Sequence, residues 1–143
     1  MSLLKIANPA TSVGLKDTVM DGIRAMEEAT VGAVLIVENQ ELKGLFSERD
    51  LMLRVILAKK DPETTLIGDV MTSPVLTIEK NTAQDDALQL MWDRHVRHLP
   101  IVGDSGQVEG VVSIRHLLHE KLEKLTQELD SLEAYFSADG IGG

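Results

Sequence analysis

The sequence predicts a mixed α/β (α+β) protein made of two copies of one β-α-β-β-α unit, followed by a C-terminal amphipathic helix. Three observations support this prediction. The chain repeats itself at a shift of 65 to 66 residues. Within each copy, the apolar residues change from helical spacing to short β-branched runs in the same order. After the second copy, leucines recur at heptad spacing.

The internal repeat aligns turn and polar residues as well as apolar ones. At a shift of 65 Pro9 falls on Pro74, and at a shift of 66 Ser47 falls on Ser113. The extra residue lies in a turn, where insertions are tolerated. The expected bounds of the two units are residues 5–62 and residues 66–120.

Each unit is expected to contain an opening strand, a helix, a β-hairpin and a second helix, in that order. In the first unit these are a strand at Ser12 and Val13, a helix through Val19 and Met26, a hairpin of residues 33–37 and 45–46, and a helix over 51–58. In the second unit they are a strand at Thr77 and Ile78, a helix through Leu88 and Met91, a hairpin of residues 98–102 and 111–112, and a helix from Ile114 onward.

The composition is that of an acidic folded protein and argues against several classes of function. With 14 Lys and Arg against 23 Asp and Glu, the formal net charge is −9, and no window supplies the basic stripe that a nucleic-acid partner needs. The absence of Cys excludes disulfides, thiol catalysis and thiolate zinc sites, and it fits a reducing compartment. No apolar run approaches the roughly 18 to 20 residues that span a bilayer. We therefore expect a cytoplasmic protein with no nucleic-acid or membrane partner.

No pattern in the chain points to catalysis or to a metal. The sequence has no G-x-S-x-G, no Walker-type loop and no G-x-G-x-x-G after a strand. His95 and His98 straddle a helix end and a strand, and His116 and His119 lack the H-E-x-x-H pattern of zinc ligands. We expect a non-catalytic protein without a metal site. The first three residues of the chain carry no part of these predictions.

Four segments carry a resemblance to a known family. They are GLFSERDL (44–51), IGDVMTSPVLTI (67–78), RHLPIV (97–102) and GVVSI (110–114). In this order and in duplicate, they resemble the tandem cystathionine-β-synthase-type repeat, called a CBS pair or Bateman module, over about residues 5–120. The resemblance implies two units in a pseudo-two-fold arrangement, with clefts that in many relatives bind AMP, ADP, ATP, NAD or S-adenosylmethionine. Such relatives commonly act as regulatory sensors and are not themselves catalysts.

Ser47 and Asp50 are candidate ligand residues because they lie where a strand turns into a helix. A carboxylate there can accept hydrogen bonds from the two vicinal hydroxyls of a ribose, and Ser47 can add a contact. The alternative is a capping box, in which the two side chains only start the helix. Under the resemblance, Asp50 matches the family's ribose-binding carboxylate, and a ligand role is preferred.

The resemblance also implies an adenine pocket and basic residues for the phosphate. The residues at family positions that flank the adenine are Met71, Pro74, Val75 and Val96. These apolar residues also suit an ordinary core. Arg97 and His98 stand where relatives place residues that meet phosphates, and Arg97 is the stronger candidate because arginine holds phosphate bidentately. Arg49 is a second candidate, and a solvated surface charge is the alternative for Arg97.

The second unit departs from the pattern. Ser113 and Arg115 are kept, but His116 replaces the expected acid and cannot accept two hydroxyl bonds as a carboxylate does. We therefore expect one competent cleft around Asp50 and one degenerate site near Ser113. The degenerate site is empty, binds a ligand in another pose, or uses protonated His116 near a phosphate.

The C-terminal segment predicts a long helix over residues 114–136 with a narrow apolar stripe, and a flexible tail over 137–143. The stripe consists of Leu118, Leu122, Leu125, Leu129, Leu132 and Phe136. Because an isolated helix of this length is marginal in water, the stripe needs a partner. We expect a homodimer through the repeats and this helix. A different partner protein, or folding of the helix back onto its own domain, is the alternative.

The preferred interpretation is a non-catalytic sensor module that binds an adenine nucleotide, with no cofactor required. AMP ranks first, with ATP or NAD as alternatives, and the regulated protein is not identified. The second interpretation is a constitutive interaction module in which both clefts are vestigial. Ser47 with Asp50 and Arg97 favour the first, and His116 favours the second.

Overall fold

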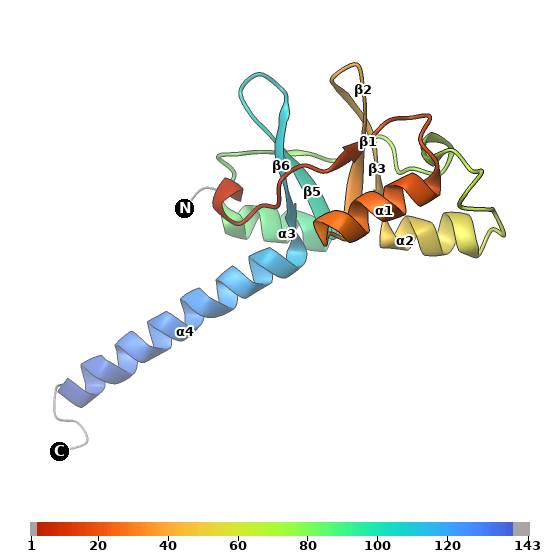
Figure 1. Ribbon diagram of the computed structural model, residues 1–143. Helices are drawn as coiled ribbons and strands as arrows, with labels where there is room; N and C mark the ends of the chain where they lie inside the picture. The colour runs from red at the N-terminus through yellow and green to blue at the C-terminus, as the bar shows by residue number, and fades with distance from the viewer. Residues whose placement is uncertain (1–2, 139–143) are drawn as a thin grey trace.

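Two three-stranded sheets lie side by side in the computed structural model, which describes residues 3–138 (Figure 1). In the first sheet, β1 (Ser12–Val13) runs parallel to β2 (Ala33–Glu38), and β2 pairs antiparallel with β3 (Glu41–Ser47). The β2 residues are mostly apolar and β-branched, and they are buried because helices cover one side of the sheet and the second sheet packs on the other.

The second sheet repeats the topology of the first. Strand β4 (Ile78–Glu79) runs parallel to β5 (His98–Val102), and β5 pairs antiparallel with β6 (Val108–Ser113). Both hairpins shift register at the equivalent place, after Ile36 in the first and after Ile101 in the second. The α/β fold class and the duplicated unit are therefore confirmed.

The first helix of each unit packs against its own sheet. These helices are α1 (Val19–Ala29) and α3 (Gln84–Arg94), and both end in a residue of left-handed conformation. Helix α1 begins with a capping box, in which Thr18 Oγ1 accepts a hydrogen bond from Asp21 N at 3.1 Å and Asp21 Oδ2 accepts one from Thr18 N at 2.9 Å. The box satisfies N–H groups that the first turn of a helix leaves without partners.

The helix that follows β3 begins earlier than the range of 51–58 expected from the sequence. Helix α2 (Glu48–Asp50) starts directly after Ser47 and continues as a π-helical stretch, Leu51–Ile56. A second capping box starts it: Asp50 N donates to Ser47 Oγ at 3.3 Å, and Ser47 N donates to Asp50 Oδ2 at 3.0 Å. Asp50 therefore lies inside the first turn of the helix.

Helix α4 (Ile114–Ala138) takes the place of the short second helix in the second unit and projects away from the two sheets (Figure 1). The predicted C-terminal amphipathic helix is present. It includes residues 137 and 138, where the sequence predicts the start of a tail. The rest of that predicted tail, 139–143, lies outside the described residues.

The segment that leads into each unit packs on the sheet of the other unit. Asn8 exchanges backbone hydrogen bonds with Val111 of β6 at 2.9 and 3.0 Å. Thr72 exchanges them with Leu45 of β3 at 2.8 and 3.0 Å. This reciprocal crossing ties the two units together and brings each leading segment to the boundary between the sheets.

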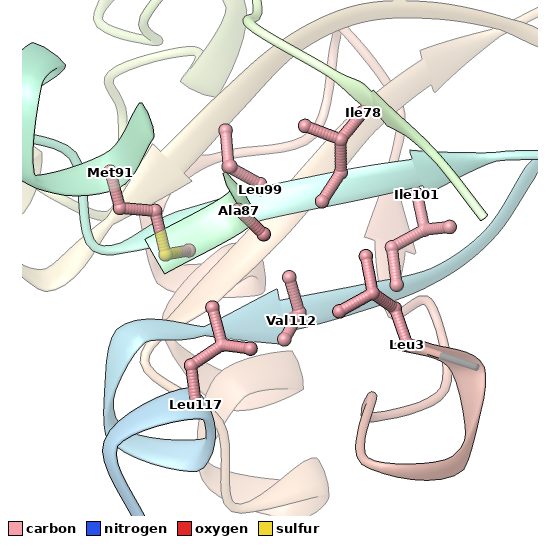
Figure 2. Packing of buried hydrophobic residues seen from close by; sticks show 8 residues of the cluster. All are labelled: Leu3, Ile78, Ala87, Met91, Leu99, Ile101, Val112 and Leu117. Carbon is pink, nitrogen blue, oxygen red and sulfur yellow. The ribbon is translucent and has the colours of Figure 1, made fainter. Parts of the chain in front are cut away.

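The N-terminal residues belong to the core of the second unit. Leu3 is fully buried and packs in one cluster with Ile101 and Val112, together with residues of α3 and α4 (Figure 2). No sequence-based prediction used the first three residues, so the structural role of Leu3 comes from the structure alone. A separate cluster around Val34, Phe46 and other residues forms the core of the first unit. Within residues 3–138, no helix is long and apolar enough to cross a membrane.

Candidate functional site

A cavity of about 370 Å³ lies between the two units, at the start of α2 and the start of β5. Seven of the nine residues predicted for the nucleotide site line it: Ser47, Arg49, Asp50, Val75, Val96, Arg97 and His98. The other two, Met71 and Pro74, do not line it. The structure thus brings together residues that lie up to 51 positions apart in the chain, and we call this cavity the Asp50 cleft.

Asp50 is the buried carboxylate of this cleft, with 7% of its surface exposed. Its Oδ2 accepts hydrogen bonds from Ser47 N at 3.0 Å and from Ser47 Oγ at 3.3 Å. Thr72 Oγ1 lies 2.9 Å from Asp50 Oδ1 and 3.1 Å from Oδ2, and it donates to this carboxylate. The predicted capping box is therefore formed, and the carboxylate also lines a cavity. A role of Asp50 as a helix cap is therefore compatible with a role as a ligand residue.

Arg54 braces the same carboxylate from the next turn of the helix. Its Nε lies 3.6 Å from Asp50 Oδ1, and its Nη1 donates to the carbonyl oxygen of Met71 at 2.7 Å. The guanidinium therefore links the helix after β3 to the crossing segment that carries Thr72. A carboxylate has about four lone-pair positions, and three hydrogen bonds from Ser47 and Thr72 already use this one, so Asp50 keeps capacity for about one hydroxyl donor of a ligand.

Apolar side chains form one wall of the cleft. This wall consists of Leu45, Leu53, Val75, Leu76 and Val96. Met71 points elsewhere: it packs against the first core, and its side chain fills the space next to Gly44, which has no side chain of its own. Pro74 is exposed. The wall is therefore apolar as expected, but it is built partly from other residues.

The polar end of the cleft is formed by Arg97 and His98 at the start of β5, with Glu48 opposite them. Burial lowers the pKa of His98, the neighbouring Glu48 carboxylate opposes this shift, and the charges of Arg97 and His116 add to it. A Cβ at Gly32 would lie 3.2 Å from Glu48 Oε1 and 3.3 Å from His98 Nε2. A larger residue at position 32 would therefore crowd this end.

A second cavity of about 470 Å³ adjoins the first. The three residues predicted for a degenerate second site, Ser113, Arg115 and His116, line it. His116 repeats the capping geometry of Asp50, because its N–H donates to Ser113 Oγ at 3.2 Å. Its Nδ1 is buried and has no hydrogen-bond partner among the described residues. The imidazole thus takes the place of the carboxylate without its hydrogen bonds.

The two cavities share part of their lining. Gly32, Glu48, Arg97 and His98 line both. Among the described residues, no group of three His, Cys, Asp or Glu is placed to hold a metal ion. The cleft residues instead provide hydroxyl and carboxylate groups at one end, an apolar wall, and guanidinium and imidazole groups at the other.

Several lining residues were not predicted from the sequence. They are Gly32, Leu45, Glu48, Leu53, Arg54, Thr72, Leu76 and His95. Thr72 is the most important of them, because its hydroxyl bonds the buried carboxylate. The available signal was its position beside Met71 in the segment that resembles the family.

Two similar units with paired cavities at their boundary define a tandem-repeat module. The sequence model of the CBS domain matches the chain twice, at residues 6–56 and 67–123. The chain therefore belongs to the CBS-domain family, as a tandem pair.

The chain resembles curated relatives and solved structures of this family. It is 35% identical over 124 residues to the CBS domain-containing protein CBSX3, mitochondrial, of Arabidopsis thaliana, covering 83% of this chain and 60% of that protein. It matches a putative signal-transduction protein with CBS domains from Burkholderia ambifaria with a TM-score of 0.80 and 28% identity, covering 86% and 95% of the two chains. The complex of CBSX2 with AMP has the same fold, with a TM-score of 0.69 and 22% identity. The match covers 85% of this chain and 96% of that chain.

Proposed function

We propose that the protein is a regulatory CBS pair that binds an adenine nucleotide in the Asp50 cleft and has no catalytic role of its own. The observation that carries this proposal is the buried Asp50 carboxylate, held beside the Thr72 hydroxyl in the wall of a cavity. A ribose presents two vicinal hydroxyls, which match a carboxylate and a hydroxyl placed side by side. The cation Arg97 lies in the same cavity and suits a phosphate.

The size of the cavity favours a mononucleotide. Its volume of about 370 Å³ lies near the lower end of the roughly 300 to 1,000 Å³ typical of ligand pockets. AMP therefore ranks before ATP and NAD. The description of CBSX2 as a complex with AMP supports the same choice, because that protein shares the fold.

The test is isothermal titration of the protein with AMP, ADP, ATP, NAD and S-adenosylmethionine in turn. We expect saturable binding near one site per chain for one of them, lost in Asp50→Ala and strongly weakened in Asp50→Asn, which keeps the volume of the side chain. The matched control is Asp21→Ala, because Asp21 forms an equivalent capping box with Thr18 far from the cleft. Equal binding by the Asp50 and Asp21 variants would reduce Asp50 to a helix cap.

A constitutive interaction module is the second candidate function. His116 supports it, because the second cavity lacks the carboxylate that Asp50 supplies in the first. In that case none of the five ligands would produce heat or raise the melting temperature. The apolar side chains exposed on the helix after β3 and on α4 would then form the interaction surface.

We also propose that the protein acts as a homodimer, through the repeats and α4. Large apolar side chains are exposed on the helix after β3, with Met52, Ile56 and Leu57 each 58% or more exposed. Sedimentation equilibrium measures this state directly. The regulated protein is not identified, and a cytoplasmic location stays a prediction, although the name of CBSX3 places that relative in mitochondria.

A further inference from the structure

Helix α4 contacts the rest of the protein only near its beginning. Leu117 is buried in the second core, and Lys121 Nζ pairs with Asp85 Oδ1 of α3 at 3.1 Å. From Leu122 to Phe136, every described side chain is exposed, and the helix extends away from both sheets (Figure 1). About two turns are therefore anchored, and the rest has no partner within the described residues.

The exposed part carries an apolar seam rather than scattered apolar residues. Leu118, Leu125 and Leu132 fall at heptad position d, and Leu122, Leu129 and Phe136 fall at position a. Leu122 is 64% exposed and Leu129 is 62% exposed. Because this seam is narrow and regular, it fits one other helix with the same spacing. A second copy of α4 has that spacing along its whole length.

Charge is distributed unevenly along α4. The helix base, residues 114–124, carries three Lys or Arg and two Glu, whereas the helix tip, residues 125–138, carries three Asp or Glu and no Lys or Arg. The acidic tip also lies at the end of the helix where the macrodipole disfavours anions. Cations of a partner placed beside the tip would offset both the repulsion among its acidic residues and their unfavourable interaction with the macrodipole. The base of a second α4 carries such cations.

The residues that flank the seam distinguish the two orientations. In a parallel pair, position g of one helix meets the following e of the other, which sets Glu128 against the partner's Glu133 on both sides. In an antiparallel pair that uses all six seam residues, His119 faces the partner's Glu133 on both sides, and Thr126 faces the partner's Thr126. On the other side of the antiparallel seam Glu128 faces the partner's Glu128. The parallel pair thus has two like-charge contacts, whereas the antiparallel pair has one and also places each His119 against a Glu133.

The groove between α3 and α4 also fits the antiparallel orientation. It measures about 410 Å³ and is lined in part by Ile114, Leu118 and Trp92, which is 71% exposed. In an antiparallel pair the helix tip of the second copy reaches this groove, with Phe136 opposite Leu118 and Tyr135 beside it. A parallel pair brings the helix base of the second copy, and not its tip, beside this groove.

We propose that α4 pairs with α4 of a second copy in antiparallel orientation, so that the helix tip of each copy lies at the α3 and α4 groove of the other. The pairing deepens the homodimer of the proposed function by stating its orientation. It does not depend on nucleotide binding.

Disulfide formation between introduced cysteines tests the orientation, because the sequence contains no Cys. A disulfide requires two Cβ atoms about 3.5 to 4.5 Å apart. We expect Thr126→Cys to form a covalent dimer under mild oxidation, whereas the neighbouring Gln127→Cys, on the outer side of the helix, does not. Both positions are exposed on a projecting helix, so neither change threatens the fold.

The ends of the seam provide the decisive pair of variants. In the antiparallel pair Leu118 and Phe136 meet each other, whereas two copies of Leu118 lie about 27 Å apart, because 18 residues of helix rise about 1.5 Å each. We therefore expect Leu118→Cys alone to form no covalent dimer on oxidation, and a mixture with Phe136→Cys to give a covalent dimer of the two variants. A covalent dimer of Leu118→Cys with itself, or a monomer in sedimentation equilibrium of the unaltered protein, overturns the proposal.

A charge reversal gives an independent readout with opposite signs. Glu133→Lys removes both contacts between His119 and Glu133 in the antiparallel pair, so we expect the dimer dissociation constant to rise about two- to fivefold. In a parallel pair the same change relieves two repulsions, and a tighter dimer overturns the proposal. Titration with AMP reports on the Asp50 cleft alone, so the nucleotide proposal and the α4 proposal can fail separately.

Discussion

Thr72 and Asp50 are 22 residues apart in the chain and share a hydrogen bond in the wall of the cleft, with Thr72 Oγ1 at 2.9 Å from Asp50 Oδ1. The Thr72 backbone is held at that place by two hydrogen bonds to Leu45 of the first sheet. The segment that leads into the second unit therefore completes the cleft of the first. Any ligand that bonds both side chains favours the arrangement in which this segment is docked.

We expect Thr72→Val to weaken nucleotide binding about tenfold while leaving the fold intact. Valine keeps the β-branched shape but removes the hydroxyl that would bond a ribose hydroxyl, and the loss of a hydrogen bond worth about 1.4 kcal/mol corresponds to about tenfold in affinity. Titration with AMP measures the effect. Thr72→Ser is the matched control, because it keeps the hydroxyl and should bind within a few-fold of the unaltered protein. Equal affinities for the Val and Ser variants would show that the hydroxyl has no part in binding.

We expect Gly44→Ala to impair the cleft indirectly. A Cβ at position 44 would lie 2.9 Å from the Thr72 carbonyl oxygen and 2.8 Å from Met71 Cγ, closer than real Cβ contacts. The crossing segment must move, which carries Thr72 away from Asp50 and costs about 1 to 3 kcal/mol of unfolding free energy. Urea unfolding and AMP titration should both change. Gly14→Ala is the control, because its Cβ would meet nothing closer than 3.5 Å, and a Gly44 variant that matches it in both assays would contradict this account.

The repeated unit could be predicted because each copy carries its own periodicity and its own turn. The two hairpins even shift register at equivalent residues, Ile36 and Ile101. The reciprocal crossing could not be predicted, since short segments such as the one around Asn8 have no period that indicates which sheet they join. For the same reason the burial of Leu3 in the second core was missed.

The candidate site was predictable where its chemistry is local. Ser47 and Asp50 are three residues apart at the start of one helix, so their mutual hydrogen bonds follow from the chain itself. Thr72 reaches them only through docking of the two units. Met71, placed on the cleft wall by resemblance, instead fills the space beside Gly44, because a residue without a side chain leaves room there.

We expect Leu3→Ala to destabilise the protein by about 2 to 5 kcal/mol, the usual cost of truncating a fully buried leucine. The loss should appear in urea unfolding as a lower midpoint at an unchanged slope. Leu66→Ala, at a leucine that is 39% exposed and lies outside the proposed dimer surface, is the control and should cost clearly less unfolding free energy. Equal stabilities for the two variants would mean that Leu3 does not pack in the second core.

The unfolding free energy should depend on pH through His98. Burial lowers its pKa in the folded protein below the ordinary 6.5, Glu48 from α2 opposes the shift, and Arg97 and His116 of α4 add to it. Between the lowered pKa and 6.5 the unfolded chain binds more protons than the folded one, so stability rises with pH in this window and is lost as the pH falls through it. Folding of the unaltered protein should therefore weaken as the pH falls below 6.5.

His98→Gln tests this dependence, because glutamine keeps a polar side chain that does not titrate. Urea unfolding of both proteins at a series of pH values gives two curves, and their difference removes the contributions of the other three histidines, which both proteins share. We expect the variant to lose less stability than the unaltered protein as the pH falls. Parallel curves would show that His98 takes up its proton equally well in the folded and unfolded chains.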